Sequence, residues 1–390
     1  MQNKKELIVL FIVMFLVMVG FGIIIPVLPF YAEDLGASPT QLGLLMAVYS
    51  VMQLIFSPIW GRISDRIGRK PVMILGITGL AISFFMMAYA SKLWMLFAAR
   101  IIGGLLSSAN MPTVMAYVAD ITTEEDRGKG MGLIGASVGL GFILGPAIGG
   151  IFSKNNLSTP FFIAGISSFI TIFLILFILK ETLTEKKEIQ EEQKFSLKQL
   201  IVQPLAILYF LQLFVSMSLS GLEATFAYFA AQKAGLTSVD IGYIFMIMGI
   251  AGAVVQGGLV GPLTKKFGEG FVIQIGTMIS AIGFGLILFI DSFLKAAIFL
   301  TIFGLGNGVI RPCLSALLTK KSTIGHGSTT GMLSSFDSLG RIMGPPLAGW
   351  LFSKTIGLPY ISGIVLSIAA FLLFFIYKIK TDKHEQTSTQ

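Results

Sequence analysis

Cysteine and histidine are almost absent from this sequence of 390 residues, which contains one cysteine and two histidines. A single thiol, Cys313, excludes an internal disulfide, and His326 and His384 alone exclude a histidine-rich metal site. The sequence also lacks a GxxxxGKS or GxxxxGKT loop, the pattern that holds the phosphates of ATP. We therefore expect no metal and no cofactor, and an ion gradient as the source of any driving force.

Charged residues are scarce as well, at 12% of the chain, whereas 54% of the residues are hydrophobic and the mean hydropathy is +0.84. A soluble globular protein has about twice this charged fraction. Helical spans of about 20 residues fit about twelve times into this length, which leaves no room for a separate soluble domain. The composition therefore indicates a membrane protein and argues against an enzyme.

Long hydrophobic runs recur along the whole chain, and each can cross about 30 Å of hydrocarbon as a helix. Nine uncharged runs lie at residues 7–32, 35–61, 71–91, 130–153, 155–179, 199–222, 241–264, 270–290 and 355–377. Three further spans contain charges and lie at 93–118, 293–319 and 327–352. The expected fold class is an all-α membrane protein with twelve transmembrane helices.

The basic residues are distributed unevenly between the two ends of these spans. If both termini are cytoplasmic, twenty of the 28 Lys and Arg residues lie in cytoplasmic segments and five lie outside. This bias sets the orientation of a membrane protein, and it accounts for the net charge of +8 without a nucleic-acid partner. We expect a multi-pass protein of a bacterial inner membrane with both termini in the cytoplasm.

An internal repeat divides the chain into two halves of six spans. Gly61 to Gly68 aligns with Gly261 to Gly268, and Met111-Pro112 aligns with Arg311-Pro312, at an offset of 200 residues. Gly145-Pro146 aligns with Gly344-Pro345 at an offset of 199. We expect an N-terminal half at 1–180, a cytoplasmic connector at 181–203 and a C-terminal half at 204–390. Paired helical halves of this kind are typical of alternating-access transporters.

Four motifs lie in order on the expected spans. They are Gly61-Arg-Ile-Ser-Asp65-Arg-Ile-Gly68-Arg69-Lys70 between spans 2 and 3, the stretch from Gly20 to Pro29 with Pro26 in span 1, Arg100-Ile-Ile-Gly103-Gly104 in span 4, and Gly135 to Gly150 in span 5. Together they resemble the drug:proton antiporter family, with twelve spans, of the major facilitator superfamily. The resemblance implies a proton-coupled multidrug efflux antiporter that exports amphipathic, often cationic compounds by alternating access.

Three of these motifs carry expected gating roles: the loop motif, the glycine-rich stretch of span 5, and the span 1 stretch with Pro26 and Pro29. In the loop motif, Gly61 and Gly68 permit tight turns, and Asp65 can accept hydrogen bonds from helix N-terminal amides or pair with a neighbouring Arg. The resemblance implies that this loop is a latch between spans. In span 5, Gly135 and Gly139, then Gly141, Gly145 and Gly149, recur at intervals of four and expose a bare helix face, with Gly150 beside it and Pro146 as a bend. Generic close packing is the alternative for span 5.

Charges inside hydrocarbon are costly, so the few present mark candidate proton or substrate sites. Glu223 in span 7 has no base near it in sequence, so we expect it to be unpaired, and its apolar surroundings favour the protonated carboxyl. We expect it to exchange a proton for substrate, with a buried structural acid as the alternative. Asp337 and Arg341 are four residues apart and can pair on one helix face, so a structural pair is favoured over a proton relay. The resemblance favours assistance to proton transfer for Arg100, and it leaves Arg311 open.

Candidate pocket residues accompany these charges. A soft aromatic cavity with one acid would accept varied amphipathic cations. The candidate lining residues are Phe226, Tyr228, Phe229, Gln53, Asn110, Met111 and Gln256. The expected partners are small-molecule drugs, protons and membrane lipid, and we expect a monomer.

Departures from the family pattern limit the prediction. Tetracycline exporters of this family carry acids in spans 1, 3 and 9, where this chain has Val17, Ser83 and Ser280. This argues against tetracycline as the main substrate. Related multidrug exporters carry an acid in span 10 where this chain has Gly308, which leaves the proton stoichiometry open. An exporter or importer of a physiological metabolite such as a sugar, or a more specific antibiotic exporter, remains an alternative.

Overall fold

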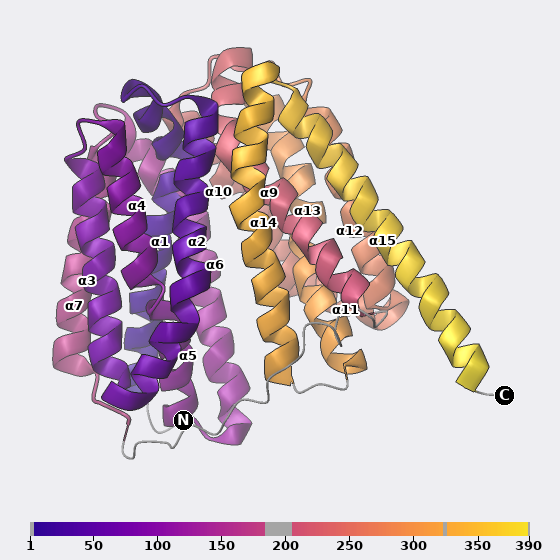
Figure 1. Cartoon of the computed structure of the whole chain (residues 1–390), viewed down its shortest axis with the longest axis horizontal. Coiled ribbons are helices and arrows are strands. Elements are labelled where there is room, and N and C mark those ends of the chain that lie inside the picture. Colours follow the sequence, from indigo (N-terminus) through magenta and orange to yellow (C-terminus); the bar gives the residue numbers. More distant parts are fainter. Residues whose placement is uncertain (1–3, 184–204, 323–325, 389–390) are drawn as a thin grey trace. The chain divides into compact units, whose positions relative to one another are not determined.

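The structure is a computed structural model that describes residues 4–183, 205–322 and 326–388, and every regular element in these residues is a helix (Figure 1). Eleven of the helical segments are long and apolar enough to cross a membrane. The remaining long helix, α14 (His326–Lys354), contains Asp337 and Arg341 together with a Pro345-Pro346 pair. The expected all-α membrane fold is confirmed.

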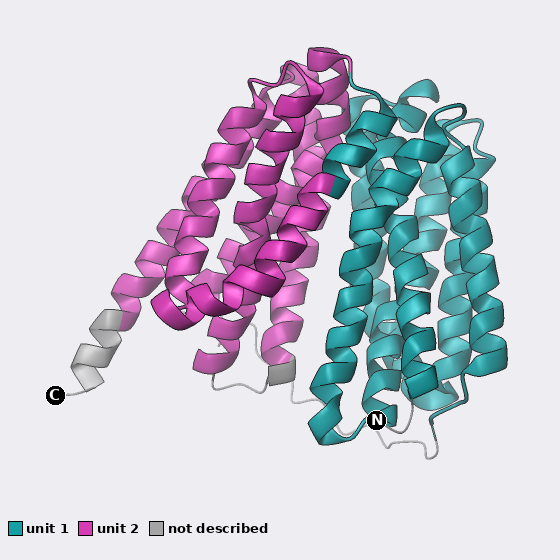
Figure 2. Cartoon of the chain, turned by 180° about the vertical axis from the view of Figure 1, so that it is seen from behind, with its two compact units in different colours: residues 1–190, 236–246 teal, residues 191–235, 247–390 magenta. Residues whose placement is uncertain are grey.

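The chain forms two compact units, coloured separately in Figure 2. Unit 1 contains residues 1–190 and 236–246, and unit 2 contains residues 191–235 and 247–390. The expected connector at 181–203 lies largely in residues 184–204, outside the described residues. The domain boundaries given above therefore stay a prediction.

In its described residues unit 1 contains seven complete helices and the first part of α10 (Ser238–Val254). The complete helices are α1 (Lys4–Asp34), α2 (Pro39–Ile67), α3 (Arg69–Ala88), α4 (Leu93–Ser107), α5 (Asn110–Ile121), α6 (Glu124–Ser153) and α7 (Thr159–Ile178). Helix α1 packs along α6, and α3 packs along α4 and α7. The expected span at 93–118 is present as α4 and α5, which are separated by a break at Ser108-Ala109.

Unit 2 contains α9 (Ala206–Ala234), the second part of α10 (Ser238–Val254), a π-helix (Val255–Leu259), α11 (Val260–Phe267), α12 (Glu269–Ile287), α13 (Phe293–Lys321), α14 and α15 (Leu358–Ser388). Helix α9 packs along α14, and α12 packs along α13 and α15. These pairs correspond to the pairs of unit 1 under the repeat, so the duplication seen in the sequence is also a duplication of packing.

Local sequence signals explain several helix ends. Ser38 caps α2, because its hydroxyl accepts from the Gln41 amide and the Gln41 side chain accepts from the Ser38 amide. Gly68 and Gly268 separate the motif helices from their successors with φ of 112° and 81°, a backbone conformation that favours glycine. The repeat is therefore conserved at the level of backbone torsions.

Candidate functional site

A cluster of four charges lies in unit 2, where α9 meets α14. Glu223 Oε2 on α9 lies 3.7 Å from Arg341 Nη1 on α14. Arg341 Nε also lies 3.4 Å from Asp337 Oδ2, one helical turn earlier. Arg311 Nη1 on α13 lies 3.6 Å from the same Asp337 oxygen. Two carboxylates thus share two guanidinium groups, and the cluster is neutral when all four are ionised.

The two carboxylates of the cluster are more buried than its two arginines. The side chains of Asp337 and Glu223 are 13% and 15% exposed, whereas those of Arg341 and Arg311 are 35% and 52% exposed. The carboxylates are therefore the enclosed members, and the guanidinium groups lie nearer to the surface of the unit. An enclosed carboxylate needs a cation or a proton, because an unpaired charge in hydrocarbon is costly.

A polar stripe on α9 holds Asp337 in place. Asp337 Oδ1 accepts hydrogen bonds from Gln212 Nε2, at 2.9 Å, and from the Ser216 hydroxyl. Gly340 and Gly344 let α14 approach this stripe, because a β-carbon at either position would overlap the backbone of α9. Gln212 and Ser216 were not predicted as site residues, although their spacing of four residues in a hydrophobic span was a usable signal.

The structure corrects one expectation and supports another. Glu223 was expected to lack a basic partner, and this is wrong, because Arg341 from a helix 118 positions away in sequence lies beside it. The expected pair of Asp337 and Arg341 is present. Arg311, which the sequence left open, joins the same cluster. A role for these residues in proton or substrate binding stays a prediction.

Arg100 lies in unit 1 and is 6% exposed. Its Cζ lies 4.4 Å from the centre of the Tyr49 ring, and its Nε donates to the Leu45 carbonyl oxygen at 3.4 Å. The Tyr49 hydroxyl in turn lies 2.6 Å from the Ser107 hydroxyl. Within the described part of the chain no carboxylate pairs with Arg100, so an aromatic face and a backbone carbonyl compensate its charge.

The aromatic residues after Glu223 are buried in this structure, and their expected role in a substrate pocket stays a prediction. Phe226, Tyr228 and Phe229 are 0%, 3% and 0% exposed. The Phe229 ring lies 4.4 Å from that of Tyr360 on α15, and the Tyr228 ring lies 6.0 Å from that of Phe352 on α14. These rings pack α9 against α14 and α15, and in this structure they are part of the core of unit 2.

The four other candidate pocket residues differ in exposure. Gln53 is half-buried, Met111 is 37% exposed, and Gln256 is exposed and donates to the Gly308 carbonyl oxygen at 3.0 Å. Gln256 lies in the π-helix, an irregularity that is frequent at functional sites. Asn110 is 2% exposed, and neither the nitrogen nor the oxygen of its side-chain amide has a hydrogen-bond partner among the described residues. Their role in substrate binding stays a prediction.

The loop motif centres on Arg69, which is 4% exposed. Its Nη1 pairs with Asp65 Oδ1 at 2.5 Å and donates to the Ser64 hydroxyl at 2.8 Å, while its Nε lies 3.2 Å from Asp120 Oδ2 on α5. The expected pairing of Asp65 with a neighbouring arginine is therefore present. The sequence analysis did not single out Asp120, although an acid at the end of a span was a usable signal.

Glu181, just after α7, also binds this junction. Its carboxylate accepts hydrogen bonds from the amides of Arg69, at 2.9 Å, and Lys70, at 3.0 Å, at the start of α3. Partial burial raises the pKa of Glu181, but hydrogen bonds from the amides of Leu183, Arg69, Lys70 and Thr182 lower the pKa further, so that it lies below its usual value. The junction of α2 and α3 is thus held by the carboxylate of a residue that lies more than 100 positions later in the sequence.

The glycines of span 5 separate into two groups. A β-carbon at Gly145 would lie 2.7 Å from the Gly22 Cα and 2.7 Å from the Val19 carbonyl oxygen on α1. Gly141 and Gly149 face α1 equally closely, and Gly150 faces the start of α10. Gly135 and Gly139, in contrast, have no atom within 4 Å of such a β-carbon, so the expectation that they share this bare face is wrong. The close approach is confined to 141–150.

Proline residues lie inside both α1 and α6. Pro26 and Pro29 are buried in α1, and Pro146 is buried in α6. Each removes one backbone N–H from its helix. Gly61, near the end of α2, contacts its surroundings only loosely, since the nearest atom to a β-carbon there is Pro112 Cβ at 3.9 Å. A gating role for these residues stays a prediction.

The repeat also preserves an ion pair with its charges exchanged. Arg69 on α3 pairs with Asp120 on α5, and at the positions 200 residues later Glu269 on α12 pairs with Lys320 on α13. Lys265 replaces Asp65 in the second copy, so a latch of the same composition is absent from it. Both halves therefore join corresponding helix ends by an ion pair, but the acid and the base have exchanged positions between the two halves.

Comparisons with known proteins agree with this architecture. The family model described as Major Facilitator Superfamily matches residues 10–326, with a second match at 259–390. Multidrug resistance protein 2 of Bacillus subtilis (strain 168) is 34% identical over 386 residues, which cover 97% of this chain and 96% of that protein. Quinolone resistance protein NorA of Staphylococcus aureus (strain MSSA476) is 31% identical over 381 residues, which cover 96% of this chain and 97% of that protein.

Solved structures share the fold at lower identity. The nucleoside transporter NupG has a TM-score of 0.77 at 16% identity and covers 96% of this chain and 98% of its own. The human organic anion transporter MFSD10 has a TM-score of 0.68 at 24% identity and covers 94% of this chain and 98% of its own. These two likenesses concern the arrangement of helices only.

Proposed function

Because this chain belongs to the Major Facilitator Superfamily, we propose that it is a proton-coupled antiporter that exports amphipathic, often cationic drugs by alternating access. Two relatives that match nearly its whole length are named for multidrug resistance and quinolone resistance. The family makes the chain a transporter and not an enzyme, and its hydrophobic helices make it a multi-pass membrane protein. We place it in a bacterial inner membrane as a monomer with both termini in the cytoplasm, in line with its basic cytoplasmic segments.

The observation that carries this proposal is the enclosed carboxylate of Glu223 with its long contact to Arg341. A distance of 3.7 Å brings opposite charges together without the geometry of a strong hydrogen bond. A proton on Glu223 would remove its need for Arg341, and Arg341 would keep its second carboxylate, Asp337. Ionised Glu223 can be compensated either by Arg341 or by a cationic group of the cargo. Proton and cargo thus compete for one carboxylate.

This competition provides the coupling. In the outward state Glu223 binds a proton, and after release of that proton to the cytoplasm the carboxylate accepts a drug from the cytoplasm or the inner leaflet. Exchange of one proton for one monovalent cation moves no net charge, so it draws only on the pH gradient, about 1.4 kcal/mol per pH unit. A second proton would add about 2.3 kcal/mol per 100 mV of membrane potential.

The other candidate residues support the cycle from a distance. Buried Arg100, beside Tyr49, contributes a fixed positive charge to unit 1. Asp65 and Arg69 act as a latch at the junction of α2 and α3, and the glycines 141–150 seal the contact of α6 with α1 against leak.

The decisive test is dye efflux driven by a pH gradient in everted vesicles. We expect Glu223→Gln to abolish the transport of a monocationic dye, because the neutral amide can neither bind the proton nor compensate the cation. Glu125→Gln, which changes an exposed acid at the start of α6, is the matched control and should transport normally. Full pH-driven activity in Glu223→Gln would remove this residue from the mechanism.

A narrower antibiotic exporter is the second candidate, favoured by the relative named for quinolone resistance. Transport of one antibiotic class without transport of structurally unrelated dyes would establish it. Proton release on addition of a metabolite such as a sugar, and not of drugs, would instead point to a physiological substrate.

A further inference from the structure

The net charge of the cluster where α9 meets α14 depends on the state of Glu223. When all four side chains of the cluster are ionised, two carboxylates balance two guanidinium groups. A proton on Glu223 removes one negative charge, whereas a cationic group of the cargo beside Glu223 adds one positive charge. The cluster therefore carries one excess positive charge in both of these loaded states. Among the residues that the structure describes, no third carboxylate pairs with either arginine, so the protein itself leaves this charge uncompensated.

Arg311 is the arginine that carries this excess charge. Asp337 Oδ1 accepts hydrogen bonds from Gln212 Nε2, at 2.9 Å, and from the Ser216 hydroxyl. Asp337 Oδ2 lies 3.4 Å from Arg341 Nε, one helical turn away on α14, and 3.6 Å from Arg311 Nη1 on α13. Once the other carboxylate of the cluster has bound a proton or the cargo, Arg341 pairs with Asp337 alone. Asp337 is then compensated without Arg311, so the Arg311 guanidinium can bind another anion.

The surroundings of Arg311 leave room for an anionic group. The Arg311 side chain is 52% exposed, the largest exposed fraction in the cluster. A guanidinium group inside a span is costly in hydrocarbon, so its exposed side faces a polar space and not lipid. A β-carbon added at Gly308, one turn earlier on α13, would meet only Gln256 Nε2 among the described atoms, at 3.3 Å. The amide of Gln256 donates to the Gly308 carbonyl oxygen, so the surface beside Arg311 is both open and polar.

We propose that Arg311 binds the carboxylate of a zwitterionic cargo, on the basis of the proposed function in which Glu223 compensates the cationic group of the cargo. With such a cargo bound, Asp337 pairs with Arg341, and the cargo supplies the opposite charges for Glu223 and Arg311. A guanidinium group suits this role because its planar fork can bind a carboxylate through two parallel hydrogen bonds. A zwitterion leaves the loaded cluster neutral, whereas a monocation leaves the excess charge in place. Arg311 therefore determines the preference for cargo with an anionic group.

Transport of rhodamine B and its ethyl ester in everted vesicles tests this role. The two dyes share a cationic core, and the free carboxylate of rhodamine B makes it a zwitterion. Arg311→Gln should lower the ratio of kcat/KM for rhodamine B to kcat/KM for the ester about ten-fold, since the variant loses hydrogen bonds between charged groups. Arg311→Lys keeps the charge but not the fork, so it should recover part of the ratio.

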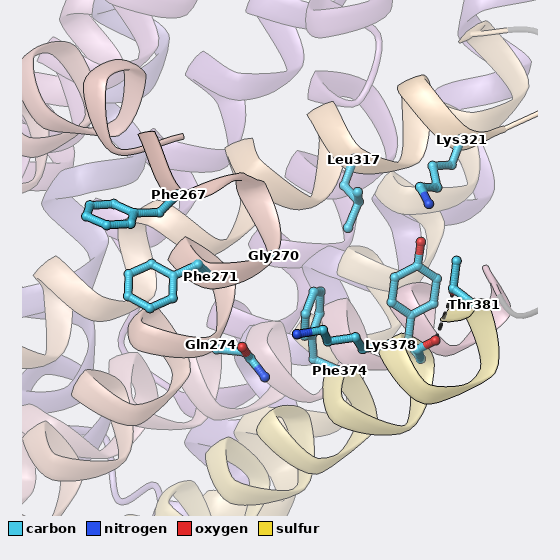
Figure 3. A pocket seen from close by; sticks show the side chains of 10 residues that line it. Phe267, Gly270, Phe271, Gln274, Leu317, Lys321, Phe374, Lys378 and Thr381 are labelled. Carbon is cyan, nitrogen blue, oxygen red and sulfur yellow. Dashed lines mark hydrogen bonds between the residues drawn. The ribbon is translucent and has the colours of Figure 1, made fainter. Parts of the chain in front are cut away.

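Lys321→Gln is the matched control for Arg311→Gln. It removes a positive charge from the same helix, α13, but from a separate pocket of about 360 Å³ that Lys321, Phe271 and Phe374 help to line (Figure 3). This pocket shares no lining residue with the charge cluster. The ratio should therefore be the same in Lys321→Gln as in the unaltered protein, and an equal fall in both variants would overturn the assignment to Arg311.

An unchanged ratio in Arg311→Gln would also overturn the proposal. Structural damage would lower kcat/KM for both dyes alike, and a free anion such as chloride at Arg311 would compensate either dye equally. A second measurement uses charge movement, because an ionised carboxylate reduces the charge of the exported cargo by one. A lumen-positive potassium diffusion potential should therefore stimulate transport of rhodamine B more than that of the ester. Equal stimulation would show that the carboxyl crosses the membrane protonated, without Arg311 as its counter-ion.

Failure of the proposed function would give a different result. Transport of both dyes by Glu223→Gln, driven by the pH gradient, would refute the exchange at Glu223. The ratio of the two dissociation constants, measured by dye fluorescence polarisation with the purified full-length protein, would still report on Arg311. An about ten-fold fall of relative affinity for rhodamine B in Arg311→Gln would support the carboxylate site, and no fall would exclude it.

Discussion

Replacing glycine by alanine at two positions of α6 isolates the close contact between α6 and α1. At Gly145 the added β-carbon would lie 2.7 Å from the Gly22 Cα and the Val19 carbonyl oxygen, whereas 3.4 Å is the lower limit of ordinary contact. The helices would have to separate by about 0.7 Å, and overpacking of this kind costs about 1–3 kcal/mol. At Gly139 an added β-carbon would have no atom within 4 Å, so Gly139→Ala carries no such cost.

Both substitutions gain helix propensity, about 1 kcal/mol relative to glycine, so the difference between them reports the contact alone. For a unit of this size, 1–3 kcal/mol corresponds to a melting temperature roughly 2–12 °C lower for Gly145→Ala than for Gly139→Ala. Fluorescence-detected size-exclusion chromatography after heating measures this difference, and proton leak in vesicles measures the loss of the seal. Equal melting temperatures for the two variants would refute the packing argument.

Three other predictions concern charged groups. The folded-state pKa of Glu181 lies below the usual value of 4.5, so its carboxylate stabilises the protein above that pH and loses this effect as the pH falls through the folded pKa. Melting temperatures below about pH 4.5 should therefore fall more for the unaltered protein than for Glu181→Gln, and parallel curves would contradict this. Asp337→Asn removes the carboxylate that pairs with Arg311 and should lower the free energy of unfolding by about 3 kcal/mol. This value is the lower end for breaking a buried ion pair, because Arg311 is half exposed. An unchanged melting temperature would argue against the cluster. Arg69→Gln should lower the free energy of unfolding by about 1.5–3 kcal/mol, because Arg69 is buried. It should also impair dye efflux more than Asp65→Asn does, because Asp65 is 44% exposed. A larger loss of efflux in Asp65→Asn would make Asp65 the main member of the latch.

The helices were predictable because the signal for a membrane span is strong and local. Long uncharged runs, the basic bias of one side and the repeat offset of about 200 residues each depend on many residues at once. Two details were not visible at this level. Both the break between α4 and α5 and the π-helix at Val255–Leu259 change backbone geometry without interrupting hydrophobicity.

The site was predictable in composition but not in pairing. Glu223 and Arg341 are far apart in sequence, and only the contact of α9 with α14 brings them together. Tyr228 follows Glu223 by five residues, which turn it about 140° away on the helix, and its ring lies beside that of Phe352 on α14. The packing of Phe226 and Phe229 depends on α14 and α15, which single-sequence patterns do not place.

The exchanged ion pairs place opposite charges at corresponding helix ends of the two halves. Arg69 begins α3 and Asp120 lies in the last turn of α5, so each charge has the same sign as the helix end that carries it. Glu269 and Lys320 oppose the macrodipoles of α12 and α13 and are favourable there. Each misplaced charge costs about 0.3–1 kcal/mol. The start of α3 therefore depends on Glu181, whose carboxylate accepts from the amides of Arg69 and Lys70, for the negative charge that Glu269 supplies directly at the start of α12.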